Sequence, residues 1–142
     1  MTSAVETLAR QVAAALASVA DIRVAWLFGS RVHDRARDDS DIDIAVSWPH
    51  DLDGAGREDG RRSIVAALTD ALGPLGETAD VVDIDRADSG VAFRAISEGR
   101  LVLELSAADR IAACTRVARR YDDDAPNRAR FLEAARRLRH RA

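Results

Sequence analysis

At 142 residues, with 47% hydrophobic and 32% charged side chains, the chain has the composition of one globular domain. Its net charge of −3 gives no overall signal for nucleic-acid binding, and all 21 cationic side chains are arginines. The single cysteine, Cys114, excludes an intrachain disulfide and is typical of the reducing cytoplasm. No apolar run approaches about 20 residues, so we expect neither a signal peptide nor a membrane-spanning helix.

The first segment, residues 2–20, is predicted to form a helix. Ser3 followed by Glu6 is a capping-box pattern, and apolar side chains then recur at helical spacing: Val5, Leu8, Ala9, Val12, Leu16 and Val19. Residues 23–28 follow as an apolar and partly β-branched run, which is typical of a buried strand. We expect this strand to end at a glycine turn.

The stretch after that strand combines Gly29-Ser30, ten intervening residues, and the pair Asp41 and Asp43. If residues 41–46 are extended, alternation puts both carboxylates on one face, about 7 Å apart at their backbones. The other face then carries Ile42, Ile44 and Val46. The stretch therefore predicts a strand, a Gly-Ser turn and a second strand with two acids on one side.

These residue types suit phosphate chemistry. Mg²⁺ is commonly bound by one or two carboxylates plus substrate phosphates, and phosphoryl-transfer enzymes use pairs of ions about 4 Å apart. A glycine allows close backbone approach, and a following helix start offers free N–H groups to a phosphate. Alone, Asp41 and Asp43 would indicate only a solvated acidic pair, and Gly29-Ser30 only a turn. Their occurrence together, at this spacing and between two predicted strands, favours a functional site.

The pattern G-S-x10-D-x-D in this context resembles the signature of the DNA polymerase β-like nucleotidyltransferase superfamily. More narrowly, FGSR with ARxDSDIDIAV is similar to the small MNT-type (minimal nucleotidyltransferase) proteins, the MntA-like antitoxins of HEPN/MNT toxin–antitoxin pairs. The resemblance covers most of the chain, although only residues 29–43 are sharply diagnostic. It implies one α/β (α+β) domain over residues 1–142, with a small mixed β-sheet and packed helices in a core of about residues 1–105. C-terminal helices would follow over about residues 106–142.

Residues 31–35 are predicted to form a short helix, followed by a polar loop to Ser40. Arginines at positions 31, 35 and 37 would lie near the triphosphate, since guanidinium groups match phosphate geometry. A solvated basic loop balanced by nearby aspartates is the alternative. Ser30 is the better candidate for direct phosphate contact, whereas Ser40 can brace the second strand. The predicted nucleotide-binding residues are Gly29, Ser30, Arg31 and Ser40.

Residues 48–60 contain a proline and three glycines, which is typical of a mobile loop. This loop is more simply a connector than a lid over the substrate. Residues 61–72 follow as an amphipathic helix, and Gly73-Pro74 supplies its stop.

The third strand is predicted over residues 78–85, where alternation separates Asp80 from Asp83 and Asp85. The resemblance implies that a third acidic residue on a neighbouring strand completes the metal site, and its match to DVV places that residue at Asp80. Asp83 is the alternative, because one sequence does not fix the facing of the strand. The implied role of this carboxylate is metal ligand and proton acceptor for the attacking hydroxyl.

The last elements are a helix over residues 89–97, an edge strand over 100–105, and helices over 106–121 and 125–141. The first of the two C-terminal helices has an apolar stripe that includes Cys114, which we interpret as packing. Asp124 can cap the final helix, whose predicted apolar face is Phe131, Leu132, Ala135 and Leu138. The end of the chain is strongly basic, which indicates either a solvated helix or, by the resemblance, a site for a protein partner.

The predicted reaction is nucleotidyl transfer from ATP, with Mg²⁺, expected as two ions, held by Asp41, Asp43 and Asp80. By the resemblance, the acceptor is a tyrosine of a cognate HEPN-type ribonuclease toxin, which the chain would adenylylate in a cytoplasmic hetero-oligomeric complex. No membrane and no direct nucleic-acid contact are expected. Two alternatives stay open: a small-molecule nucleotidyltransferase, for instance one that modifies an aminoglycoside, and a non-catalytic antitoxin that neutralises by binding.

Overall fold

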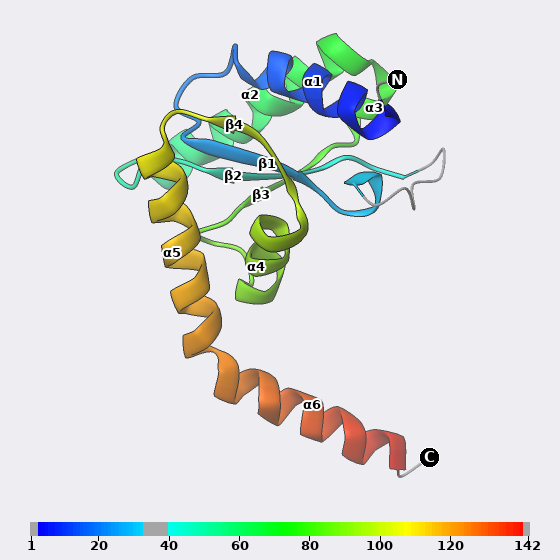
Figure 1. The fold of residues 1–142 in the computed structure, drawn as a ribbon, viewed down its shortest axis with the longest axis vertical. Coiled ribbons are helices and arrows are strands. Elements are labelled where there is room, and N and C mark those ends of the chain that lie inside the picture. Colours follow the sequence, from blue (N-terminus) through cyan, green and yellow to red (C-terminus); the bar gives the residue numbers. More distant parts are fainter. Residues whose placement is uncertain (1–2, 33–39, 141–142) are drawn as a thin grey trace.

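The protein is described by a computed structural model that covers residues 3–32 and 40–140. Four strands form one mixed sheet in the order β3-β2-β1-β4 (Figure 1). The central strand β1 runs antiparallel to both β2 and β4, whereas β3 runs parallel to β2. Their bounds are β1 Val24–Phe28, β2 Asp43–Ser47, β3 Asp80–Asp83 and β4 Arg100–Glu104. This is the mixed α/β sheet that the sequence predicts, and its last strand lies at the edge as expected.

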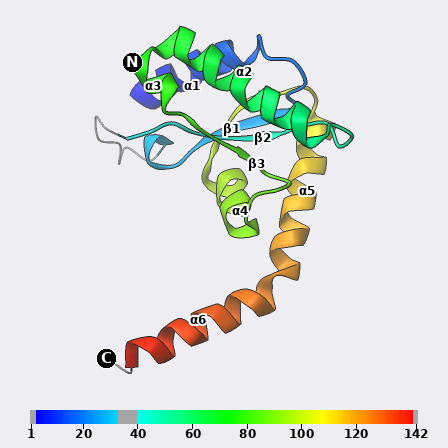
Figure 2. The same ribbon diagram turned by 180° about the vertical axis from the view of Figure 1, so that it is seen from behind.

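Helices cover both faces of the sheet (Figures 1 and 2). Side chains of α1 (Ala4–Leu16) and α2 (Gly54–Leu72) share one buried cluster with Leu27 and Ile44 from the strands. Side chains of α4 (Ser89–Glu98) and α5 (Ala107–Asp123) share a second cluster with Trp26. The sheet therefore separates two cores, one on each of its faces.

The first helix confirms the predicted cap but is shorter than predicted. The Ser3 side chain accepts a hydrogen bond from the Glu6 N–H at 3.1 Å, as the capping-box pattern indicates. The helix ends at Leu16 instead of residue 20, because the Ser18 hydroxyl donates to the Ala15 carbonyl at 2.7 Å and the chain tightens there. Asp21, with φ of 72°, then turns the chain toward β1.

The prediction of a loop over residues 48–60 was wrong in its second half, because α2 already begins at Gly54. The Asp53 side chain caps this helix by accepting from the Gly56 N–H at 2.7 Å. A Cβ at Gly60 would stand 2.4 Å from the ring of Trp48, so the glycine that resembles a loop signal in fact permits close packing. Gly73, with φ of 66°, ends the helix as predicted, and a short helix α3 (Pro74–Glu77) follows.

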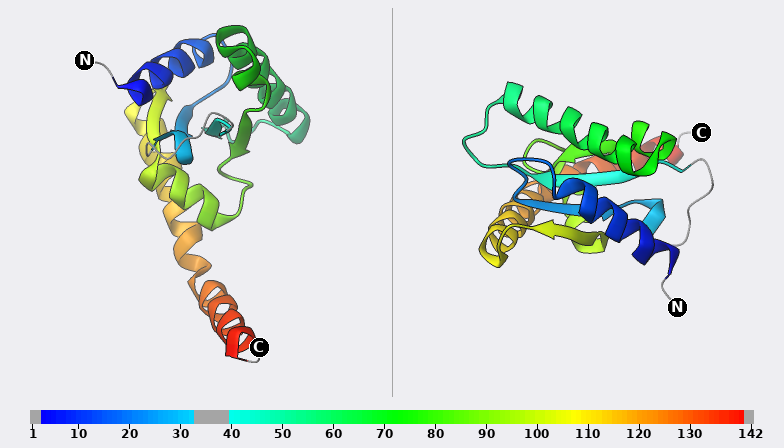
Figure 3. Two further views of the ribbon diagram at one scale, coloured as in Figure 1. Left: turned by 90° about the vertical axis from the view of Figure 1, so that its right-hand side faces the viewer. Right: turned by 90° about the horizontal axis from the view of Figure 1, so that it is seen from above.

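The C-terminal part is two helices that meet at an angle (Figures 1 and 3). In α5 the buried side chains are Ala113 and Val117, and Cys114 packs against the second cluster as predicted, whereas Ile111 at the start of the predicted apolar stripe is 57% exposed. The final helix α6 (Ala125–His140) buries none of its side chains. Asp124, predicted as its cap, uses its carboxylate to accept from the Ser89 hydroxyl. None of the described helices is both long and apolar enough to cross a membrane.

Candidate active site

The site begins where β1 ends and the chain turns at Gly29. Phe28 pairs with Asp43 across the antiparallel ladder, and Gly29 between these strands adopts φ of 84°. A Cβ at position 29 would stand 2.1 Å from Asp43 Oδ2, so the Asp43 carboxylate occupies the space that any other residue at position 29 would need. The turn and the acidic strand thus form one packed unit.

Ser30 opens a single 3₁₀ turn, η1 (Ser30–Val32), where the sequence predicted a helix over residues 31–35. Residues 33–39, including Arg35 and Arg37, lie outside the described residues. Arg31 donates from Nε and Nη2 to the Ser40 carbonyl, at 3.1 and 2.6 Å. Arg31 therefore joins the turn after β1 to the residue that precedes Asp41.

The acidic strand starts later than predicted, since β2 begins at Asp43 and not at Asp41. The antiparallel partner of β2 ends at Phe28, so the chain before position 43 has no partner on that side. Asp41 therefore lies exposed immediately before the strand, whereas Asp43 is half-buried. Alternation within the strand is as predicted, because Ile44 and Val46 share the core with α1 and α2.

Asp80 is the parallel register partner of Asp43. The Asp80 N–H donates to the Ile42 carbonyl at 2.8 Å, which fixes the start of β3 against the residue between the two acids. Val81, the next residue along β3, packs against the core on the α1 and α2 side. Register partners and alternation place Asp80 and Asp43 together on the opposite face, the face that α4 and α5 cover.

The three predicted carboxylates interact electrostatically. Burial raises the pKa of Asp43, and the charges of Asp80 and Asp41 raise it further. Ionisation of Asp43 is therefore unfavourable until a cation neutralises the charge around it. Among the described residues no group of three or more acidic, histidine or cysteine side chains is placed so that it could hold a metal ion. The paired carboxylates Asp43 and Asp80 fit Mg²⁺, which takes one or two carboxylates and completes its octahedron with water and substrate phosphate oxygens.

Asp83, the alternative third carboxylate, is engaged elsewhere. Its Oδ2 accepts from Arg57 Nη1 at 2.7 Å, and the two side chains are only 16% and 9% exposed. Arg57 also donates to the carbonyls of Leu52 and Pro49, at 2.8 and 3.2 Å. This ion pair connects β3 to the start of α2. It was not predicted, because no local sequence pattern indicates a partner 26 positions away.

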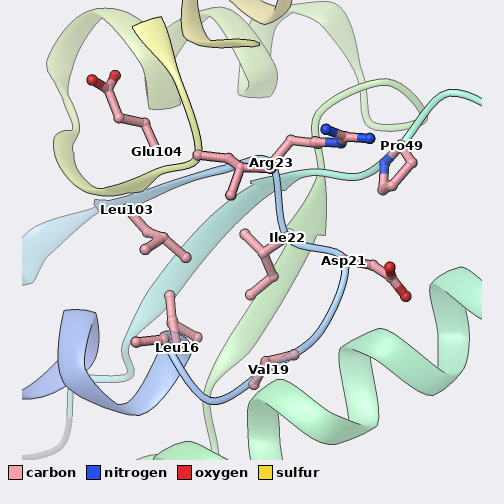
Figure 4. A pocket seen from close by; sticks show the side chains of 10 residues that line it. Leu16, Val19, Asp21, Ile22, Arg23, Pro49, Leu103 and Glu104 are labelled. Atoms are coloured by element: carbon pink, nitrogen blue, oxygen red, sulfur yellow. The ribbon is translucent and has the colours of Figure 1, made fainter.

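A separate hollow of about 360 Å³ lies at the other end of the strands, where β1 begins (Figure 4). Its lining includes Leu16, Val19, Ile22 and Leu103, and it contains none of the predicted site residues. The close-up shows these apolar side chains pointing toward one another beneath Arg23. This hollow is therefore a different feature from the carboxylate site.

The chain belongs to the family whose model is described as "Polymerase beta, Nucleotidyltransferase", which matches residues 10–108. Those residues include the Gly-Ser turn and all three predicted carboxylates. No match was found among curated proteins.

Solved structures with the same fold come from toxin–antitoxin complexes. A toxin–antitoxin crystal structure with AMP-PNP superimposes with a TM-score of 0.66 at 20% identity, covering 89% of this chain and 97% of that one. A tri-AMPylated HEPN toxin in complex with MNT antitoxin, from Shewanella oneidensis, gives 0.63 at 19% identity, covering 92% and 98%. The MntA-HepT toxin–antitoxin structure gives 0.60 at 20% identity, covering 91% and 97%. At these identities the similarity establishes the fold.

Proposed function

We propose that the chain is a protein adenylyltransferase that transfers AMP from ATP to a tyrosine of a cognate HEPN-type toxin and thereby acts as its antitoxin. The observation that carries the proposal is the register of Asp43 with Asp80, which places two carboxylates on one face beside the Gly29 turn. Asp41, whose charge acts on Asp43, would complete the set. A nucleotidyltransferase needs such an acidic group next to a phosphate-binding turn.

In this proposal Asp41, Asp43 and Asp80 would hold Mg²⁺, with two ions expected as in other phosphoryl-transfer sites. Bound there, Mg²⁺ would supply charge neutralisation for the triphosphate and its leaving group. The backbone at Gly29 and the Ser30 hydroxyl bind the β- and γ-phosphates. Because glycine has no Cβ, the backbone of the turn lies directly against the Asp43 carboxylate, so a phosphate bound at that backbone would also lie near Asp43.

The transfer exchanges a phosphoanhydride bond of ATP for a phosphoester bond to tyrosine. The tyrosine oxygen forms a bond to the α-phosphorus, the bond from that phosphorus to the bridging oxygen breaks, and pyrophosphate leaves in line. The hydroxyl proton passes to the Asp80 carboxylate. Asp80 suits this role because it is exposed at the start of β3, where the hydroxyl of an acceptor can reach it. Most of the rate enhancement would come from positioning and charge neutralisation.

Arg31 and Ser40 act at the edge of this site. The two hydrogen bonds from Arg31 to the Ser40 carbonyl hold the chain just before Asp41. We assign both residues to the nucleotide-binding region. Arg31 fixes the position of Asp41 and adds positive charge beside the triphosphate.

The acceptor is assigned from the similar structures. They include an AMPylated HEPN toxin bound to an MNT antitoxin, and the match covers 92% of this chain and 98% of that chain. A stable hetero-oligomer with the toxin, in the cytoplasm, is part of the proposal.

Intact mass spectrometry tests the proposal directly. The HEPN-type protein encoded by the neighbouring reading frame is incubated with this chain, ATP and Mg²⁺. We expect mass additions of one or more AMP units that disappear with Asp41→Asn/Asp43→Asn. The matched control, Asp51→Asn/Asp70→Asn, removes two exposed carboxylates away from the site and should leave the additions unchanged. A stable complex without any mass addition would refute transfer and leave neutralisation by binding.

A further inference from the structure

The final helix α6 is the least covered element of the described chain, and it exposes large apolar side chains. Phe131, Leu132 and Leu138 are 74%, 59% and 70% exposed. A single exposed apolar residue is ordinary on a protein surface. Three on one helix that buries none of its side chains indicate a contact surface. The helix contacts α5 at the junction and stands clear of the sheet (Figures 1 and 3). These apolar side chains are therefore available to a partner.

The charge of α6 is opposite to that of the remaining chain. Residues 125–140 contain five arginines and one glutamate, which gives +4 with histidine neutral. Since the whole chain carries −3, the remainder carries −7. Pairing of α6 with α6 of a second copy would place like charges together. The helix instead fits a partner that presents acidic groups around an apolar strip.

The direction of α6 is fixed by contacts at its junction with α5. The Ser89 hydroxyl at the start of α4 donates to Asp124 Oδ2 at 2.5 Å. The Arg128 guanidinium lies 3.5 Å from the centre of the Tyr121 ring and also donates to the Tyr121 carbonyl. The other face of that ring stacks on Phe93, with centroids 4.1 Å apart. These contacts hold α6 at a set angle to α5, so α6 is pre-organised for binding. We call this helix the arm.

Inside this bend lies a hollow of about 640 Å³, formed by the start of α4 and the first turns of α6. Its lining includes Phe131 and Leu132 with Ser89 and Asn127. The arm extends on the side of the sheet that carries α4 and α5, which is also the face of Asp43 and Asp80. It runs back toward the end of the molecule where η1 lies (Figures 1 and 2). A protein held by the arm would lie on the same side as the carboxylates.

We propose that α6 and the hollow in its bend are the docking surface for the acceptor protein, so this inference rests on the proposed function. The acceptor would place an apolar side chain against Phe131 and Leu132 and meet the arginines of α6 with acidic groups. Three large apolar residues are few for insertion into a membrane, but they suffice as anchors in a protein interface. The active site would then select its acceptor through a surface outside the catalytic carboxylates.

Binding of the purified HEPN-type protein of the neighbouring reading frame tests this by titration calorimetry. Phe131→Ser/Leu132→Ser should weaken binding by roughly 100-fold, as expected for loss of two anchors. Arg136→Glu/Arg139→Glu should weaken binding and reduce the dependence of Kd on salt. The matched controls are Ile111→Ser, an exposed apolar residue on α5, and Arg10→Glu/Arg62→Glu on α1 and α2, which should bind as wild type. Unchanged binding of AMP-PNP with Mg²⁺ would show that each variant is folded.

The outcomes separate the two claims. Equal binding of the HEPN-type protein by wild type and by both α6 variants would overturn the docking surface and leave the proposed function in place. Failure of the wild-type chain to bind or modify that protein would overturn the proposed function and the docking surface with it. Sedimentation of the chain alone as a dimer that Phe131→Ser/Leu132→Ser converts to a monomer would also overturn the inference, since a second copy would then cover α6.

Discussion

Asp43 and Asp80 are register partners on adjacent parallel strands, so two carboxylates that lie 37 positions apart in the chain project from one face of the sheet. This pairing has an energetic cost in the absence of a cation, because it raises the pKa of Asp43 on top of the effect of burial. The same repulsion that disfavours the empty site favours a divalent cation there. Substitution of Asp43 or Asp80 should therefore change both the free energy of unfolding and the affinity for Mg²⁺.

The pH dependence of stability gives the first prediction. A raised pKa means that, between the ordinary value near 3.8 and the raised value, the folded state binds more protons than the unfolded state. The contribution of Asp43 to the free energy of unfolding should therefore fall as pH rises through that window and stay low above it. Urea titrations should show the difference between Asp43→Asn and wild type growing from near zero in acid to a plateau at neutral pH. A difference that is independent of pH would contradict this.

Mg²⁺ should abolish the difference in stability between Asp43→Asn and wild type. Neutralisation by the cation removes the repulsion that destabilises ionised Asp43, so Mg²⁺ should raise the melting temperature of wild type more than that of Asp43→Asn. The same substitution should lower AMP transfer by at least about 100-fold, the scale seen when one electrostatic contact to a transition state is removed. Stability without metal should be equal or higher in the variant. Thermal unfolding with and without Mg²⁺, alongside a transfer assay, checks both statements.

Gly29→Ala should damage the site, and Gly73→Ala provides the matched control. Both glycines have positive φ, which costs a residue with a Cβ about 1–2 kcal/mol. Only at position 29 does the new methyl group meet Asp43 Oδ2, whereas position 73 has open space around it. We expect similar losses of stability but loss of transfer in Gly29→Ala alone. Equal activity of the two variants would show that the Gly29 contact with Asp43 has no role in the reaction.

The variants Asp80→Asn and Asp83→Asn should distinguish a carboxylate needed for catalysis from one needed for stability. Asp80 is exposed and its charge raises the pKa of Asp43, so its substitution should abolish transfer and leave the free energy of unfolding equal or slightly higher. Asp83→Asn leaves the buried Arg57 guanidinium without its counter-charge, which costs about 3–5 kcal/mol. Transfer per folded molecule should survive in that variant. Chemical denaturation and single-turnover rates distinguish the two, and the reverse pattern would assign the third carboxylate to Asp83.

Arg31→Lys tests the link between the turn and the acidic strand. Lysine keeps the charge but replaces two donors in a fixed plane by one ammonium, so the double hydrogen bond to the Ser40 carbonyl cannot form. Misplacing Asp41 in this way should lower kcat by about tenfold or more. ATP affinity should change little if charge alone attracts the triphosphate. A larger effect on KM than on kcat would instead identify Arg31 as a direct phosphate ligand.

Local patterns in the sequence predicted the two central strands, β1 and β2. The apolar run before Gly29 and the alternation around Asp43 gave the strands and their facing, because a period of two residues is a direct consequence of extended backbone. The same alternation separated Asp80 from Asp83. What alternation cannot give is register between strands, so the pairing of Asp43 with Asp80 needed the three-dimensional structure.

The errors arose where tertiary contacts override local signals. Gly56 and Gly60 indicated a loop, but each lies against a bulky side chain of the preceding segment and permits the helix to pack closely. The ion pair of Arg57 with Asp83 joins distant segments and has no pattern of its own. The sequence predicted an apolar face on α6 but not its exposure, because a helix can be amphipathic without a partner in its own chain.

The central claim, transfer of a nucleotidyl group to a protein, is tested most directly by the position of the transferred label. Wild-type chain, Mg²⁺ and the HEPN-type protein are incubated with ATP labelled at either the α- or the γ-phosphorus. Our account predicts that α label enters the HEPN-type protein with release of an equal amount of pyrophosphate, and that γ label stays out of it. Incorporation of γ label, or of neither label into a protein that binds the chain, would contradict it.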